Sequence, residues 1–374
     1  MLSRKKLFVL KVDEEGEKSD EDREVGVREL KEATIIEKEE EELRGEGFLQ
    51  LAEASNTATL GAEVGNSASV QQQYLTGSFP IVFAAGKGNL DEKEVGKKRS
   101  IYTESDLFIA GFPKTGTTWL KSLLFGIVKR ANHPIDHSPL LTHHPQELVY
   151  NLENDWYNQA FAYPQPHHLN ELKSPRLLST HVPYTSLPES IKTSGCRILY
   201  ISRNPLDTLV SFYYFVLEYA KKIENEDIVK SLENFFEDFC EGKFTGGPYF
   251  EHVLEFWNMS LERPDKVLFL KYEDLKDDLK PHLKRVAEFI GMPFSPQEES
   301  EDVITQIIEL CNIKNMKEVN KSGVINKFFE KKSYFRKGEV GDWTNHFSPA
   351  LVEKMNKLMK EKLDGSGLSF KLLP

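Results

Sequence analysis

The amino-acid sequence predicts an α/β fold: a single domain in which helices flank a central parallel sheet, with a P-loop-like turn after the first strand. From about residue 106 onward, short apolar blocks alternate with longer segments of helical periodicity, which is typical of parallel strands joined by crossover helices. The first apolar block leads directly into a glycine-containing loop and then into a helix. That order of elements is common at phosphate-binding sites.

Four short segments are predicted to be strands. DLFIAG, RILYIS and KVLFLKY each contain a nearly continuous apolar block, as expected for strands that are covered on both faces, and RLLSTH follows the same pattern less fully. In chain order the four segments span residues 106–111, 176–181, 197–202 and 266–272.

Five amphipathic segments are predicted to be helices. In the first, apolar residues such as Leu120, Leu124 and Val128 recur every four positions and mark one helix face. Pro205 opens the second, in agreement with the preference of proline for the first helical turn. The five helices span residues 117–130, 205–219, 249–261, 273–290 and 349–363.

Composition excludes several classes of function. The 374 residues include 48 Lys and Arg against 59 Asp and Glu, a net charge of −11, which argues against a general affinity for nucleic acid or anionic membranes. The longest apolar runs, such as residues 107–112, are far shorter than the roughly 20 residues that span a bilayer. Three widely spaced cysteines form neither a disulfide framework nor a zinc site. We therefore expect a cytoplasmic protein with no nucleic-acid partner, no membrane partner and no metal.

The first hundred residues differ in composition from the rest. Residues 1–45 are rich in acidic side chains, and residues 50–75 are rich in Ala, Ser, Thr, Asn and Gln without a sustained period. We expect residues 1–75 to be an acidic, low-complexity and poorly ordered leader. Residues 76–104 would be a linker or an atypical start of the domain, which would then cover residues 105–374.

The loop after the first predicted strand, GFPKTGTT at residues 111–118, has the glycine spacing of a nucleotide-binding loop. The usual pattern places a lysine directly after the second glycine, but here Thr117 follows Gly116 and the lysine is Lys114, inside the loop. This change points away from a magnesium-dependent NTPase and towards another phosphorylated ligand. The glycine spacing alone is equally compatible with a tight turn that carries a solvated lysine.

Three motifs in order resemble the cytosolic sulfotransferases, a family that uses 3′-phosphoadenylyl sulfate (PAPS). PKTGTTWLK at 113–121 resembles the family's 5′-phosphosulfate loop, RNPLDTLVSFYYF at 203–215 its 3′-phosphate segment, and YFRKGEVGDWTNHF at 334–347 its RKGxxGDW motif. Residues 239–257 resemble the plant-type branch. The resemblance covers roughly residues 105–370 and implies transfer of a sulfuryl group from PAPS to a hydroxyl group of a small organic acceptor.

The resemblance also implies roles for single residues. Lys114 would contact the oxygen between phosphorus and sulfur, where negative charge develops as the S–O bond breaks. The 5′-phosphate would be bound by the rest of the loop, adenine by two aromatic side chains, and the 3′-phosphate by two separate segments. The residues assigned to the 5′-phosphate are Thr115, Gly116, Thr117 and Thr118, and those assigned to adenine are Trp119 and Tyr272. The residues assigned to the 3′-phosphate are Arg203, Ser211, Arg336, Lys337 and Gly338.

His181 is the candidate general base. It ends a predicted strand, the place where α/β folds put active sites, and it matches the family's catalytic histidine. A histidine near its ordinary pKa can accept a proton from a hydroxyl group at neutral pH. In the animal-type pattern KTH a lysine stands two positions before this histidine. Here Ser179 occupies that place, which puts a second charge-stabilising lysine in doubt.

Two other functions stay open from the residues. A P-loop kinase would need a lysine directly after Gly116, where Thr117 stands. A protein that binds PAPS with little catalytic activity is the second alternative, and the presence of both Lys114 and His181 argues against it.

The acceptor and the oligomeric state are not specified by these motifs. The family acts on phenols, steroids, hydroxyjasmonates and desulfoglucosinolates. Of the family's KxxxTVxxxE dimer motif only Glu353 is retained, so we expect a monomer or a dimer through another surface. Aromatic neighbours of the motifs are the candidates for the acceptor pocket: Phe161, Tyr163, Tyr184, Tyr213, Phe328 and Phe329.

Overall fold

The computed structural model describes residues 102–152, 172–222, 224, 229–244, 246–325 and 329–373. The expected leader, residues 1–75, and all but the last three residues of the expected linker lie outside the described residues. None of the described helices is long and apolar enough to cross a membrane.

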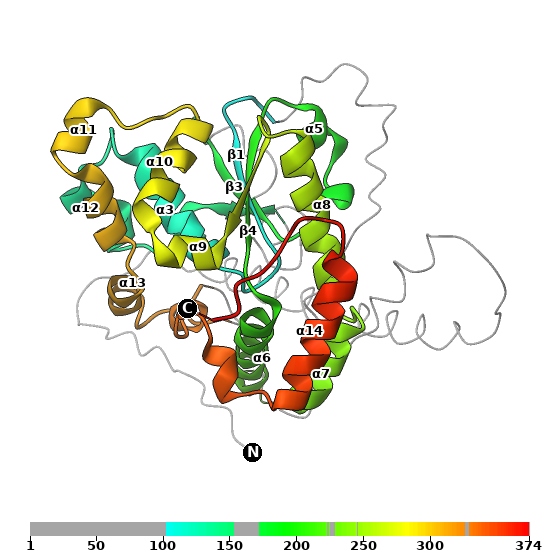
Figure 1. Cartoon of the computed structure of the whole chain (residues 1–374). Helices are drawn as coiled ribbons and strands as arrows, with labels where there is room; N and C mark the ends of the chain where they lie inside the picture. Colours follow the sequence, from blue (N-terminus) through cyan, green and yellow to red (C-terminus); the bar gives the residue numbers. More distant parts are fainter. Residues whose placement is uncertain are drawn as a thin grey trace, which may run out of the picture. The chain divides into compact units, whose positions relative to one another are not determined.

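Five parallel strands form the central sheet, in the order β2-β3-β1-β4-β5 (Figure 1). The four predicted strands are confirmed, each slightly shortened or unchanged. The two-residue β2 was not predicted, because so short a strand contains no apolar block. The strands are β1 Leu107–Ala110, β2 Tyr150–Asn151, β3 Leu177–Thr180, β4 Arg197–Ser202 and β5 Val267–Lys271.

Four of the five predicted helices are confirmed as continuous helices. They are α3 Thr117–Lys129, α6 Pro205–Lys222, α8 Tyr249–Glu262 and α14 Pro349–Leu363. Further helices and 3-10 turns complete the described chain: η1 Ile135–His137, η2 Pro139–Leu141, α4 Pro145–Leu148, η6 Tyr184–Ser186, α5 Glu189–Thr193, α7 Leu232–Cys240, α11 Pro296–Ser300, α12 Val303–Leu310, α13 Ile313–Val319, η8 Lys331–Tyr334 and η9 Asp342–Asn345.

The prediction of one helix over residues 273–290 was wrong. The segment forms two helices, α9 Tyr272–Asp277 and α10 Leu279–Phe289, separated by Asp278 in an extended conformation (φ −148°, ψ 95°). The cause is Pro281, because in a continuous helix its ring would collide with the carbonyl group of Asp277. As the third residue of α10 it lies in a helical first turn, which needs no N–H there.

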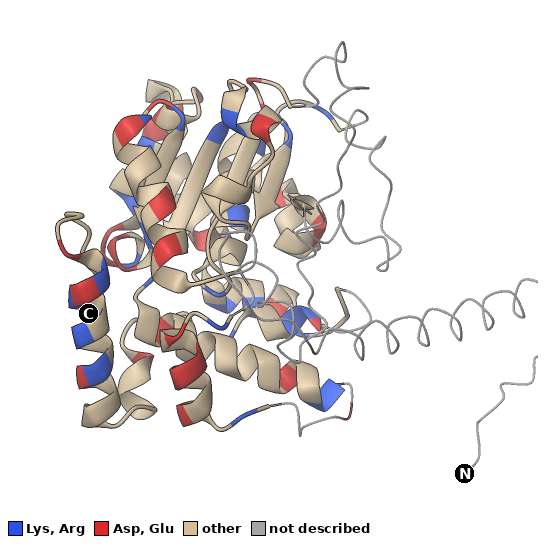
Figure 2. Cartoon of the chain, turned by 90° about the vertical axis from the view of Figure 1, so that its right-hand side faces the viewer, with Lys and Arg blue, Asp and Glu red and all other residues tan. Residues whose placement is uncertain are grey.

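Two apolar cores cover the two faces of the sheet. Successive residues of a strand point to opposite faces, so Phe108 of β1 belongs to one core and Ile109 to the other. The core around Phe108 is built with α6, α8 and α14, and the core around Ile109 with α3, α10 and α12. Figure 1 shows α3, α10 and α12 on one side of the strands and α8 and α14 on the other. Figure 2 shows charged residues of both signs interspersed over the outer helices, while the strands are largely uncharged.

Because the strands are parallel, their carboxyl ends meet at one edge of the sheet. Gly111 follows β1, His181 follows β3, Arg203 follows β4 and Tyr272 follows β5. Segments far apart in the sequence therefore converge at this edge, which is where open α/β sheets bind their ligands.

Candidate active site

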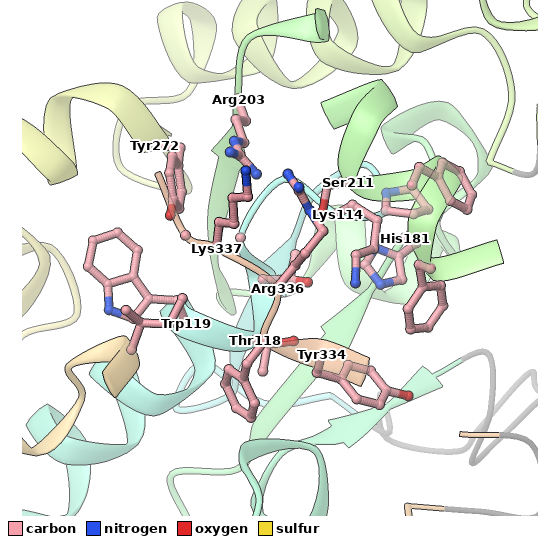
Figure 3. Close-up of a pocket in the computed structure, with 18 of the residues that line it drawn as sticks. Lys114, Thr118, Trp119, His181, Arg203, Ser211, Tyr272, Tyr334, Arg336 and Lys337 are labelled. Carbon is pink, nitrogen blue, oxygen red and sulfur yellow. The ribbon is translucent and has the colours of Figure 1, made fainter. Parts of the chain in front are cut away.

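A cavity of about 490 Å³ lies at this edge of the sheet (Figure 3). Trp119 and Tyr272 lie on one side of it and His181 on the other, with Arg203 and Arg336 between them. Of the residues to which the sequence analysis assigned a catalytic or nucleotide-binding role, those lining the cavity are Lys114, Gly116, Thr117, Thr118, Trp119, His181, Arg203, Ser211, Tyr272, Arg336, Lys337 and Gly338. Their convergence in one cavity is observed, and the role of each stays a prediction.

The loop before α3 is shaped as an anion cradle. Gly116, the residue before the helix, has φ 111°, and a Cβ atom there would lie 2.7 Å from the ring of Tyr272, so only glycine fits. The N-terminus of α3 consequently opens into the cavity, where its unpaired N–H groups and the helix dipole favour a phosphate. Thr115 departs from expectation. It is fully buried, and its hydroxyl donates to the carbonyl oxygen of Phe112 at 2.7 Å instead of facing the cavity.

Lys114 is held in an aromatic corner of the cavity. Its Nζ lies 3.9 Å from the centre of the Phe215 ring and 5.7 Å from that of Tyr334. Burial lowers the pKa of Lys114 to about 7; Glu218 opposes this shift, and the positive charges of Arg336 and Arg203 add to it. An anion bound in the cavity would favour the charged lysine and raise this pKa again.

The ring of His181 is fixed against the same loop. Its Nδ1 lies 2.6 Å from the carbonyl oxygen of Gly111. A carbonyl oxygen can only accept, so Nδ1 carries the proton and Nε2 is the basic nitrogen of the neutral ring. Burial lowers the pKa of His181 to about 4; the bond to Gly111 opposes the shift, and Lys121 and Lys114 increase it. The ring is therefore neutral at neutral pH and can accept a proton.

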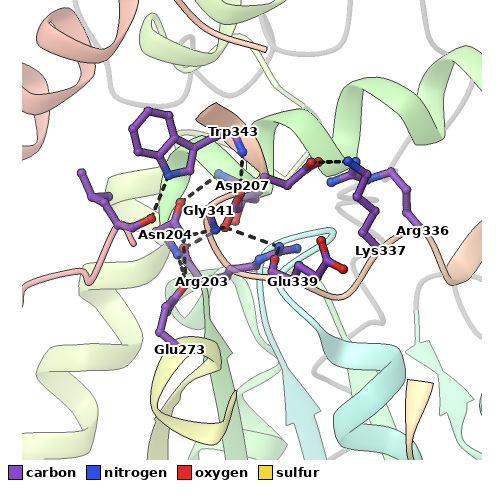
Figure 4. A network of polar contacts seen from close by, with 12 residues as sticks. Arg203, Asn204, Asp207, Glu273, Arg336, Lys337, Glu339, Gly341 and Trp343 are labelled. Carbon is purple, nitrogen blue, oxygen red and sulfur yellow. Dashed lines mark hydrogen bonds and ion pairs between the residues drawn. The ribbon is translucent and has the colours of Figure 1, made fainter. Parts of the chain in front are cut away.

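The predicted 3′-phosphate ligands form a cationic wall. Arg203 is 5% exposed and donates through Nη2 to the carbonyl oxygen of Glu339 at 2.6 Å. Arg336 and Lys337 both bind the carboxylate of Asp342 (Figure 4). Burial alone would raise the pKa of Asp342, but the hydrogen bonds from Lys337 and Arg336 outweigh it and hold that pKa well below its usual value. Asp342 thus orients both cations.

Two guanidinium nitrogens in this wall support an anionic ligand. The Nε atoms of Arg203 and Arg336 are buried and have no hydrogen-bond partner among the residues that the structure describes. Buried charged donors without an acceptor are costly, and an additional phosphate would supply acceptors. Together with the cradle at Gly116, these donors fit a nucleotide that carries phosphate at two places.

A buried hydrogen-bond network attaches the segment of residues 336–343, which contains Arg336 and Lys337, to α6 (Figure 4). The sequence did not reveal this network. Asp207 accepts hydrogen bonds from the backbone N–H groups of Gly341 and Trp343, at 2.8 and 3.0 Å, and from the side chain of Asn204 at 2.9 Å. Asn204 in turn binds the carboxylate of Glu273. An acidic residue in the first turn of a predicted helix was the available signal, but helix capping explains such a residue equally well.

Lys121 is a further residue to which the sequence analysis assigned no role. It lies on the buried face of α3, is 1% exposed, and donates to the side chain of Gln146. Gln146 lines the cavity and donates to Thr118 Oγ1 at 3.2 Å. A lysine on the apolar face of the predicted helix, four residues after Thr117, was the signal that could have found it.

Apolar and aromatic side chains line much of the rest of the cavity, together with the charged residues Lys230, Asp238, Lys243 and Lys276. Phe329 lines it as expected, but Tyr184 and Tyr213 do not. Tyr184 packs edge-on against Phe256, and Tyr213 against Phe235. The candidates Phe161, Tyr163 and Phe328 lie outside the described residues. Aromatic and apolar residues that line the cavity without having been predicted include Phe212, Phe215, Val216, Phe235, Phe244, Tyr334 and Phe335.

Comparison with known proteins shows which family has this sequence and this arrangement of residues. Residues 104–367 match the sulfotransferase domain family. The chain is 44% identical over 271 residues to cytosolic sulfotransferase 5 of Arabidopsis thaliana, covering 71% of this chain and 82% of that protein. It is 44% identical over 273 residues to flavonol 3-sulfotransferase of Flaveria bidentis, covering 71% and 84%.

Comparison with solved structures also finds sulfotransferases. An Arabidopsis thaliana sulphotransferase matches with a TM-score of 0.57 at 31% identity, over 84% of this chain and all of that one. A mouse sulfotransferase complexed with PAP matches with a TM-score of 0.55 at 26% identity, over 71% of this chain and 86% of that one.

Proposed function

The chain belongs to the sulfotransferase family, as its three motifs predicted, and we propose that it uses His181 as the base in sulfuryl transfer from PAPS to a small organic hydroxyl compound. The predictions of the family, of the parallel α/β fold and of PAPS as the donor are confirmed by the matches to cytosolic sulfotransferases and to a PAP complex. The role of each residue and the identity of the acceptor are the proposal.

One observation carries the proposal: the loop that holds Lys114 also holds His181, through the 2.6 Å bond from Nδ1 to the Gly111 carbonyl oxygen. The base and the cation that would face the leaving group are therefore fixed relative to one another. Catalysis of this kind depends mostly on such positioning and on electrostatic stabilisation.

PAPS supplies the sulfuryl group: the bond between sulfur and the oxygen that bridges to phosphorus breaks, and a new bond forms between sulfur and the acceptor oxygen. His181 Nε2 takes the hydroxyl proton of the acceptor. Lys114 and the N-terminus of α3 stabilise the negative charge left on the phosphate. The negative charges of the phosphates also raise the pKa of His181, against the lowering by burial and by the positive charges of Lys121 and Lys114. The histidine is therefore a stronger base when the nucleotide is bound.

The acceptor side of the cavity supports a substrate with an apolar ring. Phe212, Phe235 and Phe244 form a cluster of edge-on rings that lines the cavity, and Phe215 stacks on Phe329 at 4.5 Å. Such walls favour a planar or fused-ring body with the hydroxyl group directed towards His181. We propose a phenol or a steroid as the acceptor, in the cytoplasm.

His181→Ala tests the base. Turnover should fall by about 10²- to 10⁴-fold, the usual contribution of a general base, while PAP affinity stays within about twofold. His137→Ala is the matched control, because His137 lies outside the cavity with a side chain that is 77% exposed. Wild-type turnover by His181→Ala would remove this residue from the mechanism. Loss of PAP binding would show a structural role.

A further inference from the structure

We propose that Tyr200 and His252 are positioning residues that hold the backbone of His181 in register with the loop at residues 111–118. The inference rests on the proposed role of His181 as the base. Neither residue lines the cavity, and both are fully buried, with exposed fractions of 0% for Tyr200 and 1% for His252. They come from two different elements, β4 and α8.

His252 is joined to the residue that would act as base. Its Nε2 lies 3.0 Å from the backbone carbonyl oxygen of His181, and its Nδ1 lies 2.9 Å from the hydroxyl of Tyr200. The carbonyl oxygen can only accept, so Nε2 carries the proton and Nδ1 accepts from Tyr200. The tautomer of His252 is thereby fixed. Burial lowers the pKa of His252 to about 4, so the ring is neutral when the enzyme works.

Tyr200 ties this pair to the start of the phosphate loop. It pairs with Ala110, the last residue of β1, in the parallel sheet. Gly111 comes directly after Ala110, and its carbonyl oxygen accepts from the ring of His181. This circuit therefore joins His181 to the end of β1 twice, directly through its ring and indirectly through its carbonyl group, His252 and Tyr200.

The circuit gives a reason for the presence of two polar side chains, Tyr200 and His252, in an otherwise apolar core. Tyr200 stacks on Phe256 at 4.3 Å, and His252 lies edge-on to Phe112 at 5.7 Å, so phenylalanine would satisfy the packing at either position. The hydroxyl and the imidazole supply directed hydrogen bonds that phenylalanine lacks. These bonds link β1, β3 and β4 at the edge where the reacting groups meet, and a base displaced by about 1 Å can lose roughly 100-fold in rate.

The test uses four variants assayed with PAPS and 2-naphthol. Tyr200→Phe and His252→Phe keep the rings and remove the hydrogen bonds, and we expect each to lower kcat about 10- to 100-fold, with PAP affinity and the KM for PAPS within about twofold. His252→Gln can still donate to the His181 carbonyl group and should retain most of the activity. Tyr184→Phe is the control, because Tyr184 also packs on Phe256 but lies outside the circuit.

The same substitutions in a His181→Ala background separate positioning from stability. If His252 acts through His181, His252→Phe should change the residual turnover of His181→Ala by less than about twofold. An equal loss in both backgrounds, or a loss in His252→Gln as large as in His252→Phe, would overturn the inference. If His252→Phe fails to fold, the more conservative Tyr200→Phe decides by the same criteria. Wild-type turnover by His181→Ala alone would instead refute the base, and the positioning role with it.

Discussion

We predict that Lys114 makes PAP binding depend on pH. Its pKa in the free protein is about 7, against an ordinary value of 10.5, chiefly because partial burial in the cavity wall disfavours the charged form. A bound 5′-phosphate favours the ammonium form and returns the pKa towards the ordinary value. The complex then holds up to one more proton than the free protein between pH 7 and about 10, so PAP affinity should fall as the pH rises through this range.

The size of the effect follows from the two pKa values. At pH 7 half of the free protein carries a charged Lys114, and at pH 9 only about 1% does. PAP affinity should therefore fall roughly 50-fold between pH 7 and pH 9, which corresponds to about 2.3 kcal/mol at 25 °C. Cys240 and Cys311 do not titrate in this window, since burial raises the pKa of Cys240 to about 11 and that of Cys311 to about 12. Burial raises the pKa of Cys196 as well.

Isothermal titration calorimetry of PAP at pH 7, 8 and 9, in buffers of different ionisation enthalpy, measures both the affinity and the proton uptake. Lys114→Arg is the matched control, because a guanidinium group stays charged across the range and should remove the pH dependence. A wild-type affinity that is constant from pH 7 to 9, or an equal fall in Lys114→Arg, would refute the reasoning.

Three further predictions concern the nucleotide, the leader and the assembly. Arg203→Ala should weaken PAP binding about 10- to 100-fold and adenosine 5′-phosphosulfate binding little, because only PAP carries a 3′-phosphate; equal losses in a titration would contradict the assignment. Deleting residues 1–75 should leave both PAPS affinity and acceptor turnover within about twofold, and turnover lost without loss of affinity would show that the leader covers the acceptor. Light scattering should give a monomer, or a dimer that Glu353→Ala does not dissolve.

The strands could be predicted because each apolar block is buried on both faces of the sheet. Arg197–Ser202 was predicted to the residue, since only the first residue of β4 is not fully buried. The split between α9 and α10 was missed, although Pro281 in the middle of the predicted helix was the signal for it, because Leu275, Leu279 and Leu283 keep a four-residue spacing across the proline. Local periodicity does not distinguish a helix that starts near a proline from one that the proline interrupts.

The site was predictable as a set of residues but not as a geometry. The motifs placed Lys114, His181 and Arg203 at the ends of strands that parallel pairing brings together. The motifs assign no role to the side chains that orient these residues, and that role is recognisable only through tertiary contacts. His252 is an unremarkable histidine in a predicted helix, and Tyr200 an ordinary aromatic in a buried strand, until their hydrogen bonds are seen.

Transfer of label from [³⁵S]PAPS to a panel of phenols, sterols and thiohydroximates tests the central claim most directly. We predict labelled sulfate ester with at least one phenol or sterol, formed at a rate that His181→Ala lowers by about 10²-fold or more. Binding of PAP at micromolar concentration without a labelled product from any acceptor in the panel would contradict this, and would identify a protein that binds the nucleotide without transferring its sulfuryl group.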